Sequence, residues 1–506
     1  MSEFNFIVIG TGSAGAVVAS RLSENLESRV LVLEAGTRDI PSNVDDPAIF
    51  PKLQHTTVDW DYPTVPQPGL AGRVVRQPHG KMVGGTSNMN AMLYVRGNPA
   101  DFDNWAYNGA PGWRYENVVP YFQRIENFVD DPDPELGHQG PFWLQNARVT
   151  DTHPTCVPFL EACADLGYPV TENFSRQHEG AGYFHVNMKD GLRLSTAKSY
   201  LLPALERPNL TLIANAQATR LLFEGIRCVG VEYLHNGTTK TAHTNGEIIV
   251  CAGTMETPKL LMLSGIGDPD QLKQFDIPVV AAVLGVGRNL HDHVLLSVVF
   301  DLAQPVPFPR PISTPVGLFC KSSTGWITPD LELIWMPTTF EISKSDESDG
   351  LMIVLALQRP LSRGNIRLAS ANPLDAPLVD PNYFAVLSDL DRLVQGVRIA
   401  REIFASIALA PWVKAERTPG STAQTDAELG ETIRQQAISQ WHPAGSCRMG
   451  LDDLAAVDPE LRVHGVDGLR VVDTSVMPSV VGCHSQAAVM MIAERASDLI
   501  KAAHGL

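Results

Sequence analysis

The feature that most constrains the fold is a glycine-rich turn between two apolar segments near the start of the chain. Residues 4–9 are an apolar run of strand length, and Gly10, Gly12 and Gly15 follow it in the pattern GxGxxG. An apolar pattern with helical spacing comes next, and residues 29–33 are a second apolar run. This order predicts a strand–helix–strand unit in which the glycines make a tight turn and the helix N-terminus faces a pyrophosphate.

A carboxylate follows the second predicted strand. Glu34 lies 19 residues after Gly15, where a carboxylate can accept hydrogen bonds from ribose hydroxyls. The pattern therefore predicts dinucleotide binding, but it does not by itself choose between FAD and NAD.

The rest of the chain suggests that this nucleotide domain is discontinuous. The 506 residues suit two to four domains of about 150 residues each. Strand and helix patterns like those at the start return in the middle of the chain and in its last 40 residues, which predicts a second domain inserted into the first. We expect strands at 210–215, 219–223, 230–234, 247–252, 330–336, 350–357 and 469–473, a hairpin turn at Asn236-Gly237, and helices within 100–130, 388–408 and 486–504.

Charge argues against nucleic-acid and membrane partners. The chain has 39 Lys and Arg against 56 Asp and Glu, a net charge of −17, so it repels phosphate backbones and anionic lipid. No apolar run approaches the ~18 residues of a membrane-spanning helix, and no signal peptide precedes the first strand.

The cysteines point to a reducing compartment. The seven cysteines are scattered and form no CxxC pair, which argues against a disulfide framework and against a zinc site. We expect a cytoplasmic protein without a structural metal. His291 and His293 flank Asp292, but further metal ligands are lacking, so that stretch is also predicted to be structural.

Two long motifs identify a family. The first runs from Gly80 to Asn90 (GKMVGGTSNMN) and the second from Gly253 to Gly267 (GTMETPKLLMLSGIG). Both resemble the signatures of the glucose–methanol–choline (GMC) family of FAD oxidoreductases, and the resemblance extends from residue 6 to about residue 500. Within the family the chain resembles bacterial aryl- and furanic-alcohol oxidases. Further matching motifs are Asn289–His293, Ser362–Gly364, His442–Gly450 and Val472–Pro478.

The resemblance implies an α/β and α+β fold, with a Rossmann-like FAD domain and an inserted substrate domain built on an antiparallel sheet. We expect residues 1–150, 190–300 and 440–506 in the FAD domain, and residues 151–189 and 301–439 in the substrate domain.

The resemblance also implies non-covalent FAD, because Met89 occupies the position at which some family members carry the histidine that attaches the cofactor. Gly84 and Gly85 would let backbone lie against a flat ring, and the helix after residue 484 would face the flavin's pyrimidine edge with its N-terminus. The expected cofactor contacts are Gly10, Thr11, Gly12, Ser13, Gly15, Glu34, Ala35, Val83, Gly84, Gly85, Ser87, Asn88, Asn90, Ala91, Met92, Trp441, Asp473, Ser485 and Gln486.

Two histidines are the expected catalytic residues. By motif matching, His442 and His484 face the substrate side of the flavin. Oxidising an alcohol removes a hydroxyl proton and sends a hydride to flavin N5, so a neutral imidazole can serve as base while a second group holds the oxygen. We predict His442 as the main base and His484 as its partner, although the roles could be reversed or shared.

The expected reaction is oxidation of a small primary alcohol to the aldehyde. Trp441, beside His442, is either an aromatic wall of the substrate pocket or simple packing; as a wall it favours a flat aromatic or furanic ring. Trp335 and Phe340 are further candidates for the pocket lining, by position alone. Oxygen is favoured as electron acceptor because no membrane anchor is seen, with another acceptor as the alternative. Hydroxynitrile cleavage and a non-catalytic flavoprotein are the rival classes.

Overall fold

The predicted strand–helix–strand unit at the start of the chain is confirmed, and it lies in the first of two seven-stranded sheets among the described residues. The structure, a computed structural model, describes residues 4–150, 153–340 and 347–506. Strand β1 (Phe4–Ile9) leads through the glycine turn into helix α1 (Ser13–Leu22), and β2 (Val30–Leu33) pairs in parallel with β1. All four residues of β2 are buried, as an apolar run in a covered parallel sheet should be.

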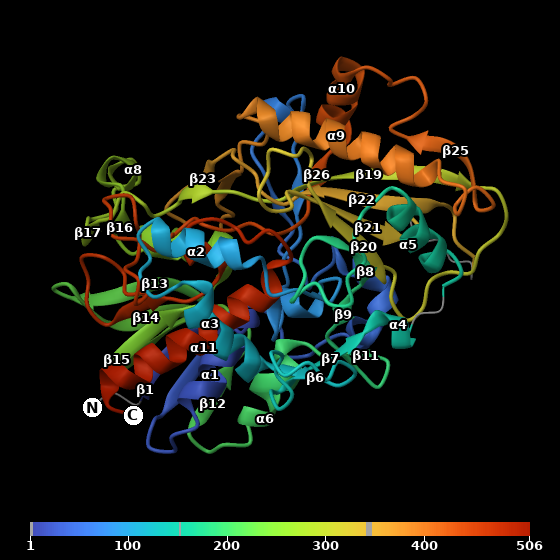
Figure 1. Cartoon of the computed structure of the whole chain (residues 1–506). Coiled ribbons are helices and arrows are strands. Elements are labelled where there is room, and N and C mark those ends of the chain that lie inside the picture. The colour runs from blue at the N-terminus through green and yellow to red at the C-terminus, as the bar shows by residue number, and fades with distance from the viewer. Residues whose placement is uncertain (1–3, 151–152, 341–346) are drawn as a thin grey trace.

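Segments far apart in the sequence complete this sheet (Figure 1). Strand β12 (Leu210–Ile213) pairs with β2, while β15 (Thr238–Val250) lies between β1 and β27 (Leu469–Val471), all in parallel. This sheet therefore includes strands from both ends of the chain and from its middle.

Strand β15 is longer than the strand predicted at 247–252. Its first half forms an antiparallel extension with β14 (Arg227–His235), which pairs in turn with β13 (Ala216–Glu224). The predicted hairpin turn is present, and Asn236 and Gly237 have φ of 51° and 74°. The early part of β15 was missed because its residues are polar and mostly exposed, so no apolar run marks them.

The second sheet is antiparallel, and its two faces are covered by different parts of the molecule. Its order is β25–β19–β22–β21–β20–β8, with β26 also paired to β19. Figure 1 shows α9 on the outer side of this sheet, with α10 and α5 nearby. The strands are β8 (Gly180–Tyr183), β19 (Val294–Leu302), β20 (Val316–Cys320), β21 (Leu331–Met336), β22 (Leu351–Leu357), β25 (Val413–Thr418) and β26 (Ile438–Ser439); the helices are α5 (Cys156–Asp165), α9 (Leu387–Phe404) and α10 (Asp426–Gln436).

The structure corrects the expectation that Trp335 lines the substrate pocket. Trp335 packs outward against Phe159 and Phe404, at centroid distances of 5.1 and 5.5 Å, and so belongs to the core under the helices. Its neighbour Ile334 points to the opposite face, because successive strand side chains alternate. Trp335 therefore does not line the substrate pocket.

One predicted domain boundary falls inside a strand. The boundary at residue 300 lies within β19, and all of β19 belongs to the second sheet. We propose that the two domains divide before Val294; the remaining boundaries stay predictions.

Helices from the two ends of the chain pack against each other. The region predicted as helical from 100 to 130 contains α2 (Pro99–Tyr107) and α3 (Tyr115–Ile125), and the last predicted helix is α11 (Ser485–His504). Helix α11 packs on α1, where buried Glu494 accepts hydrogen bonds from Arg21 and from Tyr200. This packing holds the N-terminus of α11 next to the glycine turn. Helix α7 (Gly253–Leu263) follows β15.

Candidate active site

The glycine turn leaves a space that the rest of the protein does not fill. A Cβ at Gly10 would lie 2.4 Å from the Cys251 carbonyl oxygen, and one at Gly15 would lie 2.0 Å from the Gly10 oxygen. Both glycines are therefore needed for close packing. A Cβ at Gly12, in contrast, would meet nothing within 4 Å. Gly12 caps α1 without a side-chain hydrogen bond, so the first backbone N–H groups of the helix remain available to an anion.

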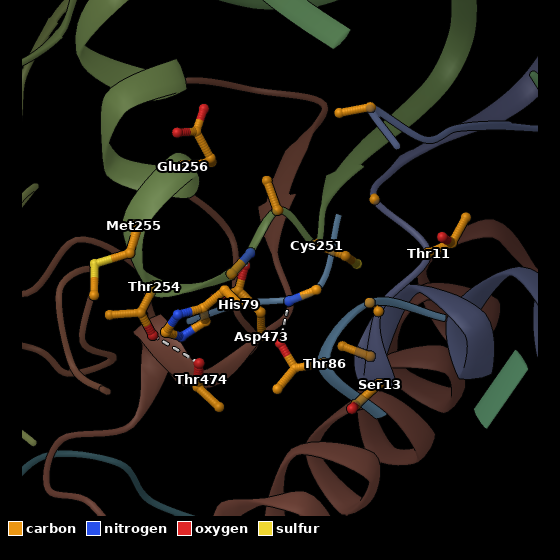
Figure 2. A pocket seen from close by; sticks show the side chains of 18 of the residues that line it. Thr11, Ser13, His79, Thr86, Cys251, Thr254, Met255, Glu256, Asp473 and Thr474 are labelled. Carbon is orange, nitrogen blue, oxygen red and sulfur yellow. Dashed lines mark hydrogen bonds between the residues drawn. The ribbon is translucent and has the colours of Figure 1, made fainter. Parts of the chain in front are cut away.

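A cavity of about 1200 Å³ opens beside this turn (Figure 2). The predicted cofactor contacts that line it are Gly10, Thr11, Gly12, Ser13, Glu34, Ala35, Gly85, Trp441, Asp473, Ser485 and Gln486.

Glu34 lies at the end of β2, in this wall, where the ribose was expected. Its carboxylate accepts hydrogen bonds from the Thr11 N–H at 3.0 Å, from the Thr11 hydroxyl, and from the Gly36 N–H at 2.7 Å. Burial raises the pKa of Glu34, and these donors oppose that shift. The carboxylate is thus held in place and borders the cavity.

Several predicted contacts fold the cofactor loop and are not among the residues lining a cavity. The Ser87 hydroxyl donates to the Gly84 carbonyl at 2.6 Å, and the Asn88 amide donates to the Val83 carbonyl at 2.7 Å. Gly84 has φ of 98°, and a Cβ there would lie 2.6 Å from Asn88 Nδ2. These four residues, like Gly15, shape the backbone that the wall depends on.

Asp473 connects three segments at the edge of the cavity. Its carboxylate accepts hydrogen bonds from the Gly253 N–H at 2.9 Å, the Thr257 hydroxyl at 2.6 Å and the Ser475 N–H at 2.8 Å. The structure also adds wall residues that were not predicted. Residues 251–256 lie within or beside the second sequence signature, whereas residues 216–218 come from β13 and carry no distinctive residue type. Trp60, Tyr62 and His79 are among the further wall residues.

A second cavity, of about 890 Å³, adjoins the first. Four residues line both cavities, which places the meeting point at Thr86, Trp441, Ser485 and Gln486. The predicted residues found only in the second cavity are Asn90, Ala91, Met92, Phe340, His442 and His484. The other residues that line only this cavity are Phe50, Gln54, Pro78, Met89, Leu93, Leu295, Thr314, Ile334, Val354 and Gln440. No Asp, Glu, Lys or Arg occurs among these lining residues, which come from the described parts of the chain.

His442 and His484 meet in this second cavity. Their ring centroids are 5.3 Å apart and their planes are at 88°. His442 follows Trp441, whose φ of 63° is rare for a bulky residue, and its own N–H donates to Asp292 at 2.9 Å. Burial lowers the pKa of His442 well below its ordinary value, so this imidazole is neutral and able to accept a proton.

A buried carboxyl group lies behind His484. Glu332 Oε1 is 3.5 Å from His484 Nε2, and Glu332 Oε2 accepts hydrogen bonds from the amides of Gln358 at 2.6 Å and Gln440 at 3.0 Å. Burial raises the pKa of Glu332 to about 8 and lowers that of His484 to about 3. Glu332 was not predicted, although a single acid inside the apolar segment Leu331–Met336 was an available signal.

His291, on one side of Asp292, makes structural contacts. His291 Nδ1 lies 2.6 Å from the Asn289 carbonyl, and the Val480 N–H donates to His291 Nε2 at 2.7 Å. His291 thus connects two loops through both ring nitrogens.

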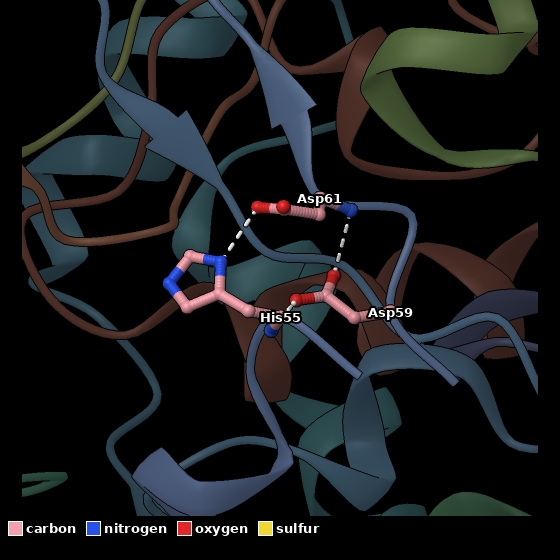
Figure 3. Close-up of side chains that lie close together, drawn as sticks. All are labelled: His55, Asp59 and Asp61. Carbon is pink, nitrogen blue, oxygen red and sulfur yellow. Dashed lines mark hydrogen bonds and ion pairs between the residues drawn. The ribbon is translucent and has the colours of Figure 1, made fainter. Parts of the chain in front are cut away.

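One group of possible metal ligands occurs within the described ranges (Figure 3). His55 Nδ1 lies 2.8 Å from Asp61 Oδ1, while the Asp59 oxygens accept from the backbone N–H groups of His55, Asp61 and His79. These mutual hydrogen bonds account for the arrangement of the three side chains, so the cluster carries no metal assignment.

The first cavity fits FAD on its own geometry. The open space at Gly12, the uncapped helix N-terminus and the buried carboxylate of Glu34 provide the features that a pyrophosphate and a ribose need. The N-terminus of α11 at Ser485, where the cavities meet, suits the polar edge of the flavin ring.

Comparisons with known proteins agree with this geometry. The family described as GMC oxidoreductase matches residues 4–295 with its N-terminal part and residues 360–493 with its C-terminal part. Choline dehydrogenase from Mus musculus mitochondria is 38% identical over 99% of this chain and 89% of its own length, and an oxygen-dependent choline dehydrogenase of Brucella suis is 36% identical over 98% and 95%. The crystal structure of pyridoxine 4-oxidase from Mesorbium loti superposes with a TM-score of 0.93 and 31% identity, covering 98% of this chain and 99% of that one.

Two further predictions can be compared with the structure. Within the described residues, no helix is both long and apolar enough to cross a membrane. All seven cysteines are buried.

Proposed function

Because the chain belongs to the GMC oxidoreductase family and is an FAD-dependent alcohol oxidoreductase, we propose that it oxidises a small, neutral primary alcohol with a flat ring to the aldehyde. The lining of the second cavity carries this proposal. It contains the two histidines, aliphatic side chains and the aromatic pair Trp441 and Phe340, whose ring centroids are 6.1 Å apart.

The absence of charged residues from that lining favours a neutral substrate over choline. A quaternary ammonium group would enter a pocket whose lining, over the described residues, offers no carboxylate as counter-charge. The relative whose structure superposes here is named for pyridoxine, which supports a flat-ring alcohol for this chain.

The two histidines divide the work on the hydroxyl group. FAD, when bound, supplies the acceptor for the hydride that leaves the alcohol carbon. His442 takes the hydroxyl proton, since it is neutral and its Nδ1 is already engaged by His293 at 3.0 Å, which leaves Nε2 for the substrate. His484 holds the alcohol oxygen from the other side of the pocket.

We propose oxygen as the electron acceptor and the cytoplasm as the location. The printed names of the Brucella relative and of the pyridoxine enzyme, an oxygen-dependent dehydrogenase and an oxidase, support the first part. The seven buried thiols are consistent with a reducing compartment.

An anaerobic titration tests the substrate and the reaction class. Benzyl alcohol and furfuryl alcohol should bleach the flavin absorbance at least ~10-fold faster than choline at equal concentration, since ~1.4 kcal/mol of unfavourable charge burial is enough for that ratio. Faster bleaching by choline would overturn the neutral-substrate proposal. Release of benzaldehyde from mandelonitrile without bleaching, in an enzyme that no alcohol reduces, would show a lyase.

Admitting air after the bleaching tests the acceptor. Oxygen as acceptor predicts recovery of the yellow colour within turnover times and one hydrogen peroxide per aldehyde. A flavin that stays reduced in air but is reoxidised by a quinone would assign a dehydrogenase.

A further inference from the structure

A third imidazole lies behind His442, away from the substrate cavity. His293 is fully buried, its ring is at 86° to that of His442, and the two Nδ1 atoms are 3.0 Å apart. A contact of this length between two ring nitrogens needs one hydrogen, so one Nδ1 donates and the other accepts. The question is which of the two carries it.

The proposed role of His442 sets the direction of this hydrogen bond. His442 lines the second cavity, whereas His293 is not among the residues that line it, and Nδ1 of His442 faces His293. A base at this position must therefore accept the alcohol proton at Nε2. Because a neutral imidazole has one N–H, an unprotonated Nε2 puts the hydrogen of His442 on Nδ1, and His293 Nδ1 accepts it.

The backbone holds both rings in register. Strand β26 pairs with β19 through Ser439 and Val294, and the Gln440 N–H donates to the His293 carbonyl at 2.9 Å. Asp292, the residue before His293, accepts the His442 N–H. These contacts fix the backbone positions from which the two imidazoles approach each other.

We propose that His293 is a positioning residue that holds His442 in the tautomer with hydrogen on Nδ1, so that Nε2 presents a lone pair to the alcohol. This inference rests on the proposed function, because it assigns the base for that oxidation.

Nitrogen-15 NMR of the resting holoenzyme, labelled at histidine, tests the tautomer without turnover. The His442 signals are identified by their loss in His442→Asn. We expect Nδ1 to resonate as a protonated nitrogen and Nε2 as an unprotonated one. Hydrogen on Nε2 of His442 would overturn the proposal, whatever alcohol the enzyme uses.

Variants of His293 test the consequence for the reaction. His293→Leu should slow flavin reduction by roughly 10- to 100-fold, a part of the ~10²–10⁴ that a positioned base contributes, with little change in alcohol affinity. His293→Asn should recover most of the rate, because its Oδ1 can accept from His442 Nδ1. His153→Leu, which removes a buried imidazole outside the two cavities, is the matched control and should reduce at the wild-type rate.

Each outcome bears on one proposal. A wild-type reduction rate in His293→Leu, or equal loss in the Leu and Asn variants, would overturn the role of His293. If His293→Leu does not fold, His293→Asn and the wild-type NMR spectrum still decide. If no alcohol reduces the wild-type flavin, the proposed function fails, while the tautomer measurement remains valid.

Discussion

His442 and His484 both line the second cavity, but different groups lie behind them. An imidazole lies behind His442, whereas a carboxyl group with a raised pKa lies behind His484. The two histidines are therefore chemically distinct, even though their motifs assign both to the same pocket. Single variants should separate their roles.

We expect His442→Ala to slow flavin reduction by about 10²-fold or more, since a positioned base contributes ~10²–10⁴. Flavin content should stay near normal, because His442 lines only the second cavity. His484→Asn should be milder than His484→Ala, since an amide can still hold the alcohol oxygen. Stopped-flow reduction with a deuterated alcohol checks this; a wild-type rate for His442→Ala beside a slow His484→Ala would reverse the roles.

Glu332 makes stability depend on pH in a defined direction. The pKa of about 8 in the folded protein is above the ordinary value near 4.3, so the folded state holds the proton more tightly than the unfolded state. Stability from this group is fully present below about pH 4.3 and is lost as pH rises to about 8. The thermal midpoint of the wild type should therefore fall, relative to Glu332→Gln, between pH 5.5 and pH 8.5.

Glu416→Gln is the control for that comparison. It removes a carboxylate from β25 of the same sheet, where Glu416 pairs with Arg401 away from the histidines. Its pH dependence should parallel that of the wild type. Parallel curves for Glu332→Gln and the wild type would show that Glu332 is ionised throughout the range.

At the scale of the elements, two glycines in the turn between β1 and α1 differ in role. Gly15 is needed for close packing, whereas Gly12 borders the space that we assign to the cofactor. Gly12→Ala adds a methyl group that meets no protein atom within 4 Å, while Gly15→Ala places one 2.0 Å from a carbonyl oxygen. Gly12→Ala should therefore keep the wild-type circular dichroism spectrum but lose most of its FAD. Gly15→Ala should lower the thermal midpoint of the apoprotein as well. A Gly12→Ala protein with full FAD content would mean that the pyrophosphate lies elsewhere.

The sequence predicted elements where local pattern and final environment agree. Strands β1 and β2 are apolar runs in a sheet covered on both faces, and Asn236-Gly237 suits a tight hairpin. The early part of β15 could not be found in this way, because its exposed polar residues are held by pairing with β14.

The sequence could not predict which face of a strand a side chain occupies or which distant residues contact one another. Strand β21 is buried on both sides, so no polarity difference shows that Trp335 faces the helices and Ile334 the cavity. Glu332 and His293 could not be placed behind His484 and His442 either, because these contacts join segments that are far apart in the sequence. The family resemblance, in contrast, predicted that His442 and His484 share a pocket, and both line the second cavity.

At the scale of the whole molecule, FAD should be held without a covalent bond. Met89 lines the second cavity, and a thioether is not a nucleophile that would attach the flavin. Acid precipitation should therefore release a yellow supernatant that contains FAD. Flavin retained in the washed pellet would show a covalent link through another residue, which peptide mapping would identify.

The order of strands in the first sheet has a consequence for how the protein is made. Strand β27 and helix α11 come from the last 40 residues, yet β27 pairs with β15 and α11 packs on α1. During translation, the early βαβ unit emerges long before these partners, so the side of α1 that α11 covers and the edge of β15 that pairs with β27 stay open until the last 40 residues are added. The nascent chain is thus exposed to aggregation until it is nearly complete. A chain stalled on the ribosome before residue 469 would contain the glycine turn but would lack both β27 and α11. Such a chain could not retain FAD.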